Sequence, residues 1–232
     1  MRLKKMTFLS IHPEFIKSYL NFGIFARAIK NKSLCVDVLN LRDYSSHPQA
    51  HIDDRPYGGG DGMVMSCEPI FKAIRSFDIK PYCILPSPVG RPWKQSSTTR
   101  LLEHEHILWI CARFGGVDQR IIDNLVDEQI SLGDYIISGG ELASLCIADS
   151  LSRLIPKAVG NPESVREESF SPRLGGLLEY PQYTRPQIFE GHRVPSELVS
   201  GDHQKISAWK KAQTKEQTQK LRPDILAKNS SK

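Results

Sequence analysis

The chain has 232 residues, of which 40% are hydrophobic, and a formal net charge of +5. This length allows one large domain or two smaller ones, with a core that needs no disulfide or metal to hold it together. No apolar run approaches the ~20 residues of a membrane span, and the N-terminal apolar stretch breaks at His12-Pro13-Glu14, too early for a signal peptide. We therefore expect a cytoplasmic protein that does not enter a membrane.

The five cysteines are widely spread along the chain, and no two of them form a Cys-x-x-Cys pair. This spacing argues against a structural zinc site, and the residues alone predict no metal ligands. Several cysteines stand in apolar runs, such as Cys83 before Ile84-Leu85. These are expected to be buried, reduced thiols, which fits a reducing compartment.

Charge is distributed unevenly. Residues 1–170 hold 20 Lys and Arg against 20 Asp and Glu, whereas residues 171–232 hold 11 against 6. A neutral body with a basic tail indicates a small-ligand site on the body and a polyanion contact on the tail. The same pattern also fits a solvated helical face with a frayed end, so charge alone leaves both interpretations open.

The first two-thirds of the chain alternates short apolar runs with helix-like segments. Residues rich in Val, Ile, Leu and Cys predict strands at Met6–Ile11, Leu34–Leu39, Tyr82–Leu85 and His106–Cys111. Helices are expected at Pro13–Lys30, Glu68–Phe77 and Lys94–His104, the second with Pro69 at its first position. This alternation predicts an α/β fold with a parallel sheet and helices on both faces.

The stretch Ser131–Leu142 has the most informative local pattern. A short apolar run, Tyr135-Ile136-Ile137, is bracketed by glycines and leads into a helix expected at Glu141–Leu154. Glycine lets the backbone approach a ligand, and a helix start offers unpaired N–H groups. Alone, this pattern also fits an ordinary loop after a strand. Because ligands bind beyond the carboxyl ends of parallel strands, the loops after Leu85, Cys111 and Ile137 are expected to meet at one crevice.

Composition changes after the first 160 residues. Residues 161–176 are rich in Gly, Pro, Ser and charged residues and are expected to form a flexible linker between a domain of residues 1–160 and one of residues 177–232. The best helix of the second domain is His203–Lys220, with Trp209 as its anchor. Residues 227–232 are expected to be disordered.

Further motifs accompany the Ser131–Leu142 stretch in a fixed order. They are Asp53–Met63 (Asp-Asp-Arg-Pro-Tyr-Gly-Gly-Gly-Asp-Gly-Met), Leu85–Arg91, Cys111–Asp118, Ser152–Pro156, Glu168-Ser169-Phe170 and Tyr180–Pro186. In order and spacing they resemble the bacterial tRNA (guanine-N1)-methyltransferases of the TrmD type, over roughly residues 6 to 225. The resemblance implies the SPOUT fold, a parallel sheet with a C-terminal trefoil knot, followed by a small, mainly helical tRNA-binding domain. It also implies methylation of N1 of guanine 37, on the 3′ side of the anticodon, with S-adenosylmethionine as the methyl donor.

Two residues match the family's catalytic groups. The family's general base is an aspartate in an Asp-Ser-Phe segment, where this chain has Glu168. The extra carbon–carbon bond lengthens the arm by about 1.5 Å, and a misplacement of about 1 Å can cost on the order of 10²-fold in rate. Neighbouring Glu167 is the rival candidate. Arg153 matches the arginine that offsets charge on the guanine O6, although its position also suits a cation at a helix C-terminus.

The resemblance also implies a cofactor site built from main-chain groups. The matching residues are Pro88, Gly90, Ala112, Gly115, Leu132, Gly133, Tyr135, Ile137, Gly139 and Gly140. Two of them depart from the family: Ala112 replaces a glycine, and Gly115 replaces a glutamate that faces the methionine end of the cofactor. The family also uses Mg²⁺, so the loss of this carboxylate bears on both cofactor affinity and metal use.

Substrate contacts follow from the same match. Asp53, Gly59 and Gly62 belong to the loop that holds the target guanine, and Arg185 and the lysines of the tail would contact phosphates. The resemblance implies that the partner is tRNA and not DNA, and that the protein forms a homodimer with composite active sites, as the family does. Cys111 is interpreted as a packing residue, because methylation of a ring nitrogen needs no covalent adduct.

Two other functions stay open at this stage. Because Gly115 lacks the carboxylate, the chain could be a catalytically weakened RNA-binding module of the same fold. A related SPOUT enzyme that modifies another base is the third candidate, but it would be expected to lack the Asp53–Gly62 and Tyr180–Pro186 motifs.

Overall fold

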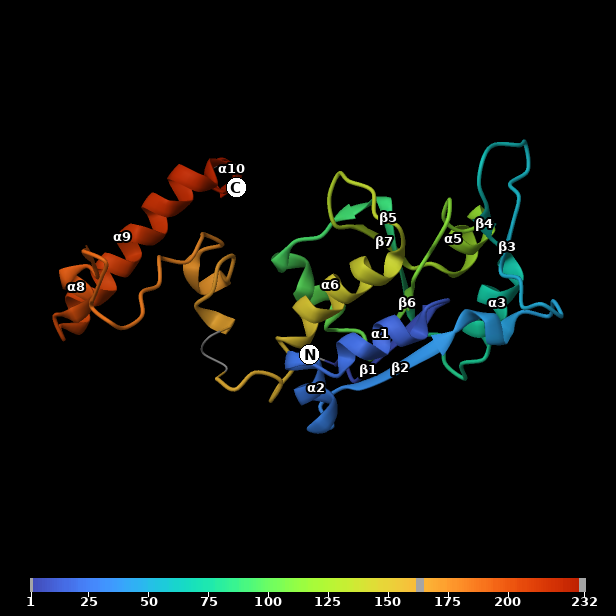
Figure 1. The fold of residues 1–232 in the computed structure, drawn as a ribbon, viewed down its shortest axis with the longest axis horizontal. Coiled ribbons are helices and arrows are strands. Elements are labelled where there is room, and N and C mark those ends of the chain that lie inside the picture. Colours follow the sequence, from blue (N-terminus) through green and yellow to red (C-terminus); the bar gives the residue numbers. More distant parts are fainter. Residues whose placement is uncertain (1, 162–164, 230–232) are drawn as a thin grey trace. The chain divides into compact units, whose positions relative to one another are not determined.

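A computed structural model describes residues 2–161 and 165–229. The chain forms two compact units, Met1–Gly160 and Asn161–Lys232 (Figure 1). In the described part of the chain, no helix has the length and apolar character needed to cross a membrane.

The first unit is built on a five-stranded sheet with the order β2-β1-β6-β5-β7, in which every pairing is parallel. Its strands are β1 (Lys5–Ser10), β2 (Cys35–Asn40), β5 (Tyr82–Pro92), β6 (His106–Ile110) and β7 (Glu128–Ser131). A separate two-stranded antiparallel sheet joins β3 (Asp53–Asp54) to β4 (Val64–Met65). The predicted α/β class with a parallel sheet is confirmed.

Helices cover both faces of the sheet because its strands send alternate residues to opposite sides. In β1, Phe8 packs in one core cluster with residues of α1 (Pro13–Leu20), α2 (Gly23–Lys30) and α6 (Gly140–Ser152). Its neighbour Leu9 belongs to the other cluster, with residues of α3 (Cys67–Arg75) and α5 (Gln119–Leu125). Both clusters lie within the first unit, so this unit has a complete core of its own.

Several element predictions need correction. Residues 13–30 form two helices, because the chain turns at Asn21 and Phe22 and Gly23 takes φ +62°. Residues 94–104 contain a 3₁₀ turn, Gln95–Ser97, and only a short α4, Thr98–Leu101. In α3 the cap is Ser66, so Pro69 occupies the third helical position instead of the first. A 3₁₀ turn at Leu41–Tyr44 and the helix α5 were not expected.

The apolar run Tyr135–Ile137 is not a strand. Ile136 is 81% exposed in a loop, and the strand that precedes this loop is β7. Residues 128–131 were not predicted as a strand because β7 is short and polar: its Ile130 faces the first core cluster, whereas Gln129 lies on the opposite side of the strand. Exposure of apolar side chains in the loop, in contrast, is what a ligand-binding segment would show.

The second unit is mainly helical. It contains a 3₁₀ turn at Pro172–Leu174, the two-stranded hairpin of β8 (Ile188–Phe189) and β9 (His192–Arg193), and the helices α8 (Ser196–Val199), α9 (His203–Leu221) and α10 (Pro223–Asn229). Disorder was expected from residue 227 onward, but α10 includes residues 227–229; residues 230–232 lie outside the described part.

Aromatic contacts tie the start of this unit to α9. Trp209 of α9 lies 6.5 Å from the ring centre of Tyr180 and 6.3 Å from that of Tyr183. The ammonium of Lys210 lies 4.5 Å from the centre of the Tyr180 ring. Trp209 therefore acts as the anchor that the sequence predicted.

Within the segment expected to be a linker, residues 168–177 form a compact turn. The Phe170 N–H donates to the Leu177 carbonyl at 2.8 Å, and the Glu179 N–H donates to the Ser169 hydroxyl at 2.9 Å. The Leu178 N–H donates to the hydroxyl of Thr218 in α9. These bonds fix the backbone around Glu168 to the second unit.

Candidate active site

A cleft of about 440 Å³ lies at the carboxyl ends of β5, β6 and β7. Three segments of the first unit form most of its lining, residues 85–89, 112–117 and 129–140 without Asp134. The cleft is where a parallel α/β sheet is expected to bind a ligand, and its volume lies in the ordinary range for a cofactor site.

The first segment is a loop that leaves and rejoins the sheet. Both Pro86 and Arg91 pair with Ile130 of β7, so residues 87–90 bulge out of strand β5. Gly90 closes this bulge against β7, where an added Cβ would lie 2.4 Å from the Ile130 nitrogen. Only glycine allows this approach of two backbones.

Replacing Gly90 by alanine is expected to displace the bulge. Overpacking lowers the free energy of unfolding by about 1–3 kcal/mol. Because the clash here is with backbone, which cannot move aside as a flexible side chain can, we expect a loss near the upper end of this range. Thermal unfolding and cofactor titration measure the two effects. Gly160→Ala is the control, because its Cβ would meet only the end of the Arg27 side chain, at 3.2 Å. Equal melting temperatures for the two variants would contradict the argument.

The second segment is held by a buried ion pair. The Arg113 Nε donates to Glu141 Oε2 at 2.9 Å, and the Ser10 hydroxyl donates to the other carboxylate oxygen at 2.7 Å. Glu141 is only 1% exposed, so its charge needs both partners. Since Arg113 also donates to the Ser138 carbonyl, this pair joins the second segment to the third.

Glycines bring the third segment against the second. The Gly140 N–H donates to the Ala112 carbonyl at 2.7 Å, and a Cβ on Gly140 would lie 2.8 Å from the Ala112 nitrogen. Gly133 has φ +157°, and a Cβ there would meet the Tyr135 ring at 2.7 Å. Main-chain groups therefore form much of this wall, as expected for a site that reads its ligand through the backbone.

Nine of the ten residues expected to bind the cofactor line this cleft. They are Pro88, Ala112, Gly115, Leu132, Gly133, Tyr135, Ile137, Gly139 and Gly140. Gly90 instead packs on β7, as described above. Gln129 also lines the cleft, and its Oε1 is a buried acceptor without a hydrogen-bond partner in the described structure. Gln129 and Ser10 stand in none of the sequence motifs, and Glu141 was expected only as the start of a helix and was not assigned to the site.

The loop expected to hold the target base, residues 53–63, is hydrogen-bonded at its C-terminal end to the second segment of the cleft. The Gly115 N–H donates to the Met63 carbonyl at 2.9 Å, and the Met65 N–H donates to the Gly116 carbonyl. Asp53 opens the loop as part of β3, paired with Met65. The glycines Gly58, Gly59, Gly60 and Gly62 all have positive φ, between 80° and 119°, and the loop containing them is exposed.

Cys111 lies beneath the cleft with no exposed surface, and its Sγ lies 3.4 Å from the Ser144 hydroxyl. Burial raises the pKa of this thiol well above its ordinary value. It therefore stays protonated and packs in the core.

Residues 4–228 match the family model described as tRNA (Guanine-1)-methyltransferase TrmD. The chain belongs to the TrmD family. It is 43% identical to a tRNA (guanine-N(1)-)-methyltransferase of Staphylococcus carnosus, over 97% of this chain and 91% of that protein. It is also 43% identical to the enzyme of that name from Moorella thermoacetica, over 95% and 89%.

A solved member of the TrmD family has the same fold. The crystal structure of tRNA (m1G37) methyltransferase from Aquifex aeolicus matches with a TM-score of 0.78 and 36% identity, covering 98% of this chain and 96% of that one.

The two residues expected to be catalytic belong to different units. Arg153 follows the last residue of α6, and its N–H donates to the Asp149 carbonyl. Because α6 has 13 residues, its C-terminal end lies about 20 Å from the cleft at its start. Glu168 stands in the compact turn of the second unit. Its neighbour Glu167 forms an ion pair with Arg173 at 3.3 Å.

Proposed function

We propose that this protein transfers the methyl group of S-adenosylmethionine to N1 of guanine 37 in tRNA. The observation that carries the proposal is the cleft of three glycine-dependent loops, in a chain that matches the TrmD family from residue 4 to 228. The relatives are named for methylation of guanine N1 in tRNA, and the Aquifex aeolicus structure is named for position 37.

S-adenosylmethionine fits the chemistry of the cleft. Its adenine and ribose need donors and acceptors at close range, which glycine-rich backbone supplies. The free acceptor on Gln129 suits an amino group such as that of adenine. When bound, the cofactor supplies a methyl group on a sulfonium, which is already a good leaving group. The residues around it need only align the guanine, remove its N1 proton and stabilise the negative charge that develops on O6.

In this proposal Glu168 removes the proton from guanine N1 as the new bond forms. Arg153 donates to O6 and offsets the negative charge that develops there.

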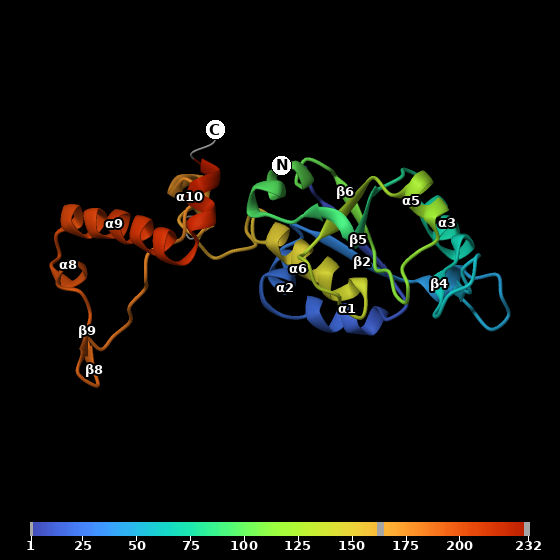
Figure 2. The ribbon, with the colours of Figure 1, turned by 90° about the horizontal axis from the view of Figure 1, so that it is seen from above.

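A homodimer with composite active sites is part of the proposal. The ~20 Å length of α6 separates Arg153 from the cleft of its own subunit, which supports a site that takes Arg153 from a second subunit. A surface for that subunit exists on α1 and α6, which lie side by side in Figures 1 and 2. Phe15 is 44%, Tyr19 41% and Leu142 50% exposed there, and such apolar surface marks interaction sites.

Leu142→Asp is therefore expected to produce a monomer that has lost methyl transfer. A charge on this face must be desolvated if the interface forms. Sedimentation at micromolar concentration gives the mass of the parent and of the variant. Ile79→Asp, at a residue 84% exposed in the same unit, is the control that should stay dimeric. A monomeric parent protein would refute the composite site.

The decisive test is transfer of labelled methyl to tRNA transcripts. A transcript with guanine at position 37 is expected to be methylated at N1, and one with adenine there is not. Nuclease digestion and chromatography identify the modified base. Binding of tRNA and cofactor without transfer would support the alternative, a catalytically weakened RNA-binding module. In that case the loss of the family's glutamate, replaced here by Gly115, would explain the missing activity.

The trefoil knot, a role for Mg²⁺ and a cytoplasmic location remain predictions of the resemblance.

A further inference from the structure

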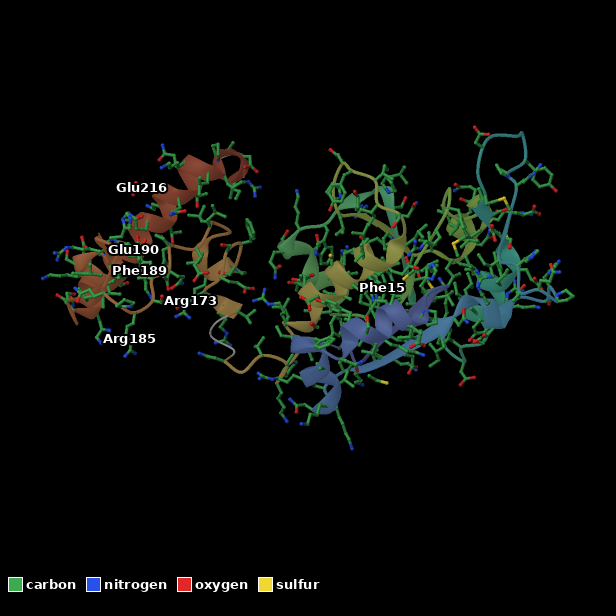
Figure 3. The ribbon with its side chains drawn as sticks, in the orientation of Figure 1. Phe15, Arg173, Arg185, Phe189, Glu190 and Glu216 are labelled. Carbon is green, nitrogen blue, oxygen red and sulfur yellow. The ribbon has the colours of Figure 1, made fainter. Side chains whose placement is uncertain are left out.

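The hairpin of the second unit exposes apolar and basic side chains that the proposed methyl transfer does not use. Every residue from 182 to 193 is exposed, including Phe189 at 63% and Ile188 at 47%. Figure 2 shows the hairpin projecting away from α9, and Figure 3 labels Phe189, Glu190 and Arg185 in this part of the unit. A two-stranded hairpin has no core of its own, so exposed aromatic surface there is not explained by packing.

The turn of the hairpin is tight and strained. Glu190 has φ +49° and Gly191 has φ +82°, so both central residues take the positive φ that a two-residue type I′ turn requires. Glycine adopts this conformation readily, but a glutamate does so at a cost in energy. The turn fixes how the flanking residues are presented, and strain of this kind is a reason to look for function.

The ladder sorts the tip into two faces. Phe189 pairs with His192, and Ile188 pairs with Arg193, and directly opposed residues place their side chains on the same face. One face therefore carries an aromatic ring beside an imidazole, and the other an aliphatic chain beside a guanidinium. Planar rings stack on unpaired bases, and a guanidinium binds phosphate.

The stem of the hairpin is anchored while its tip is free. Tyr183, five residues before Ile188, lies 6.3 Å from Trp209 of α9, and the Val194 N–H donates to the Gln187 carbonyl at 3.0 Å to close the ladder. A fixed stem loses little further freedom when the tip binds, which favours affinity.

We propose that the tip of this hairpin binds an unpaired segment of the tRNA, with one base stacked on Phe189 on one face and the phosphate of a neighbouring nucleotide on Arg193 on the other face. The charge of the region selects RNA over an apolar partner, since residues 171–232 carry 11 basic and 6 acidic residues. The inference rests on the proposed function, because that function makes tRNA the ligand. It adds a contact outside the cofactor cleft.

Titration of the full-length protein into fluorescently labelled tRNA transcript at fixed salt tests this contact. Phe189→Ala is expected to weaken binding by on the order of tenfold, because one stacked base is lost. Phe189→Tyr keeps the ring and should bind as the parent does. Val199→Ala, which removes other exposed apolar surface from the same unit, should also bind normally. Arg193→Ala should lower the salt slope by about one.

Three outcomes would overturn the inference. Parent-like affinity of Phe189→Ala for tRNA shows that the ring contacts no base. An equal loss of affinity for a fully paired RNA duplex shows that no unpaired base is involved. A smaller sedimenting species for Phe189→Ala shows that the tip packs on a second copy of the chain. Failure of the parent protein to bind tRNA would instead refute the proposed function, so the two failures are distinguishable.

Discussion

Glu168→Gln is expected to reduce methyl transfer by about 10²- to 10⁴-fold while S-adenosylmethionine still binds. Glutamine keeps the size of the side chain but cannot accept the N1 proton, and general base catalysis contributes about that much to a rate. Single-turnover transfer to tRNA measures the chemical step. Calorimetry measures cofactor binding, which should be unchanged because the cleft is built from the first unit.

Two matched variants sharpen this prediction. Glu167→Gln alters the neighbouring carboxylate, which is paired with Arg173, and should leave most of the activity intact. Glu168→Asp restores the length found in the family, and its rate shows whether the longer arm costs activity. Near-normal turnover of Glu168→Gln together with a large loss in Glu167→Gln would move the base to residue 167.

Arg153→Ala is also expected to slow methyl transfer while S-adenosylmethionine still binds. It removes the group assigned to the charge on O6, and loss of one such donor costs about 10²- to 10³-fold in rate. Loss of cofactor binding in this variant would show that Arg153 supports the cleft instead.

The cofactor cleft was predictable because its loops depend on glycine. Gly139 and Gly140 were assigned to the cofactor from the family resemblance, and the structure shows how closely the backbone packs there: an added Cβ would lie 2.3 Å from Arg113 Nε or 2.8 Å from the Ala112 nitrogen. The strand that carries the third loop was missed because only alternate residues of β7 face the core.

Contacts between residues far apart in the chain could not be predicted from the sequence. The Ser10–Glu141 hydrogen bond joins residues 131 positions apart, and a lone serine and a helical glutamate carry no pattern that pairs them. Arg153 was assigned from its motif, but only the 13-residue length of α6 shows that it lies far from its own cleft. The resemblance already implied a composite dimer, and the fold adds this distance as support for it.

Deleting residues 161–232 is expected to separate cofactor binding from tRNA binding. The remaining unit, residues 1–160, contains both core clusters and the whole cleft, so it should fold and bind S-adenosylmethionine with near-parental affinity. It loses the basic tail, the hairpin and Glu168, so tRNA binding should fall by several orders of magnitude and methyl transfer should vanish. Calorimetry and tRNA titration measure the two affinities.

Salt dependence gives the same prediction a second measurement. Each phosphate neutralised by Lys or Arg releases counterions, so the logarithm of the tRNA association constant falls linearly with the logarithm of salt. The full chain should show a steep slope and the 1–160 unit a shallow one. Free guanosine should not be methylated by the full chain, because it lacks the phosphates that bring the second unit, and with it Glu168, to the substrate. If the 1–160 unit kept the steep slope, tRNA would be bound by the first unit, and the division of roles between the units would be wrong.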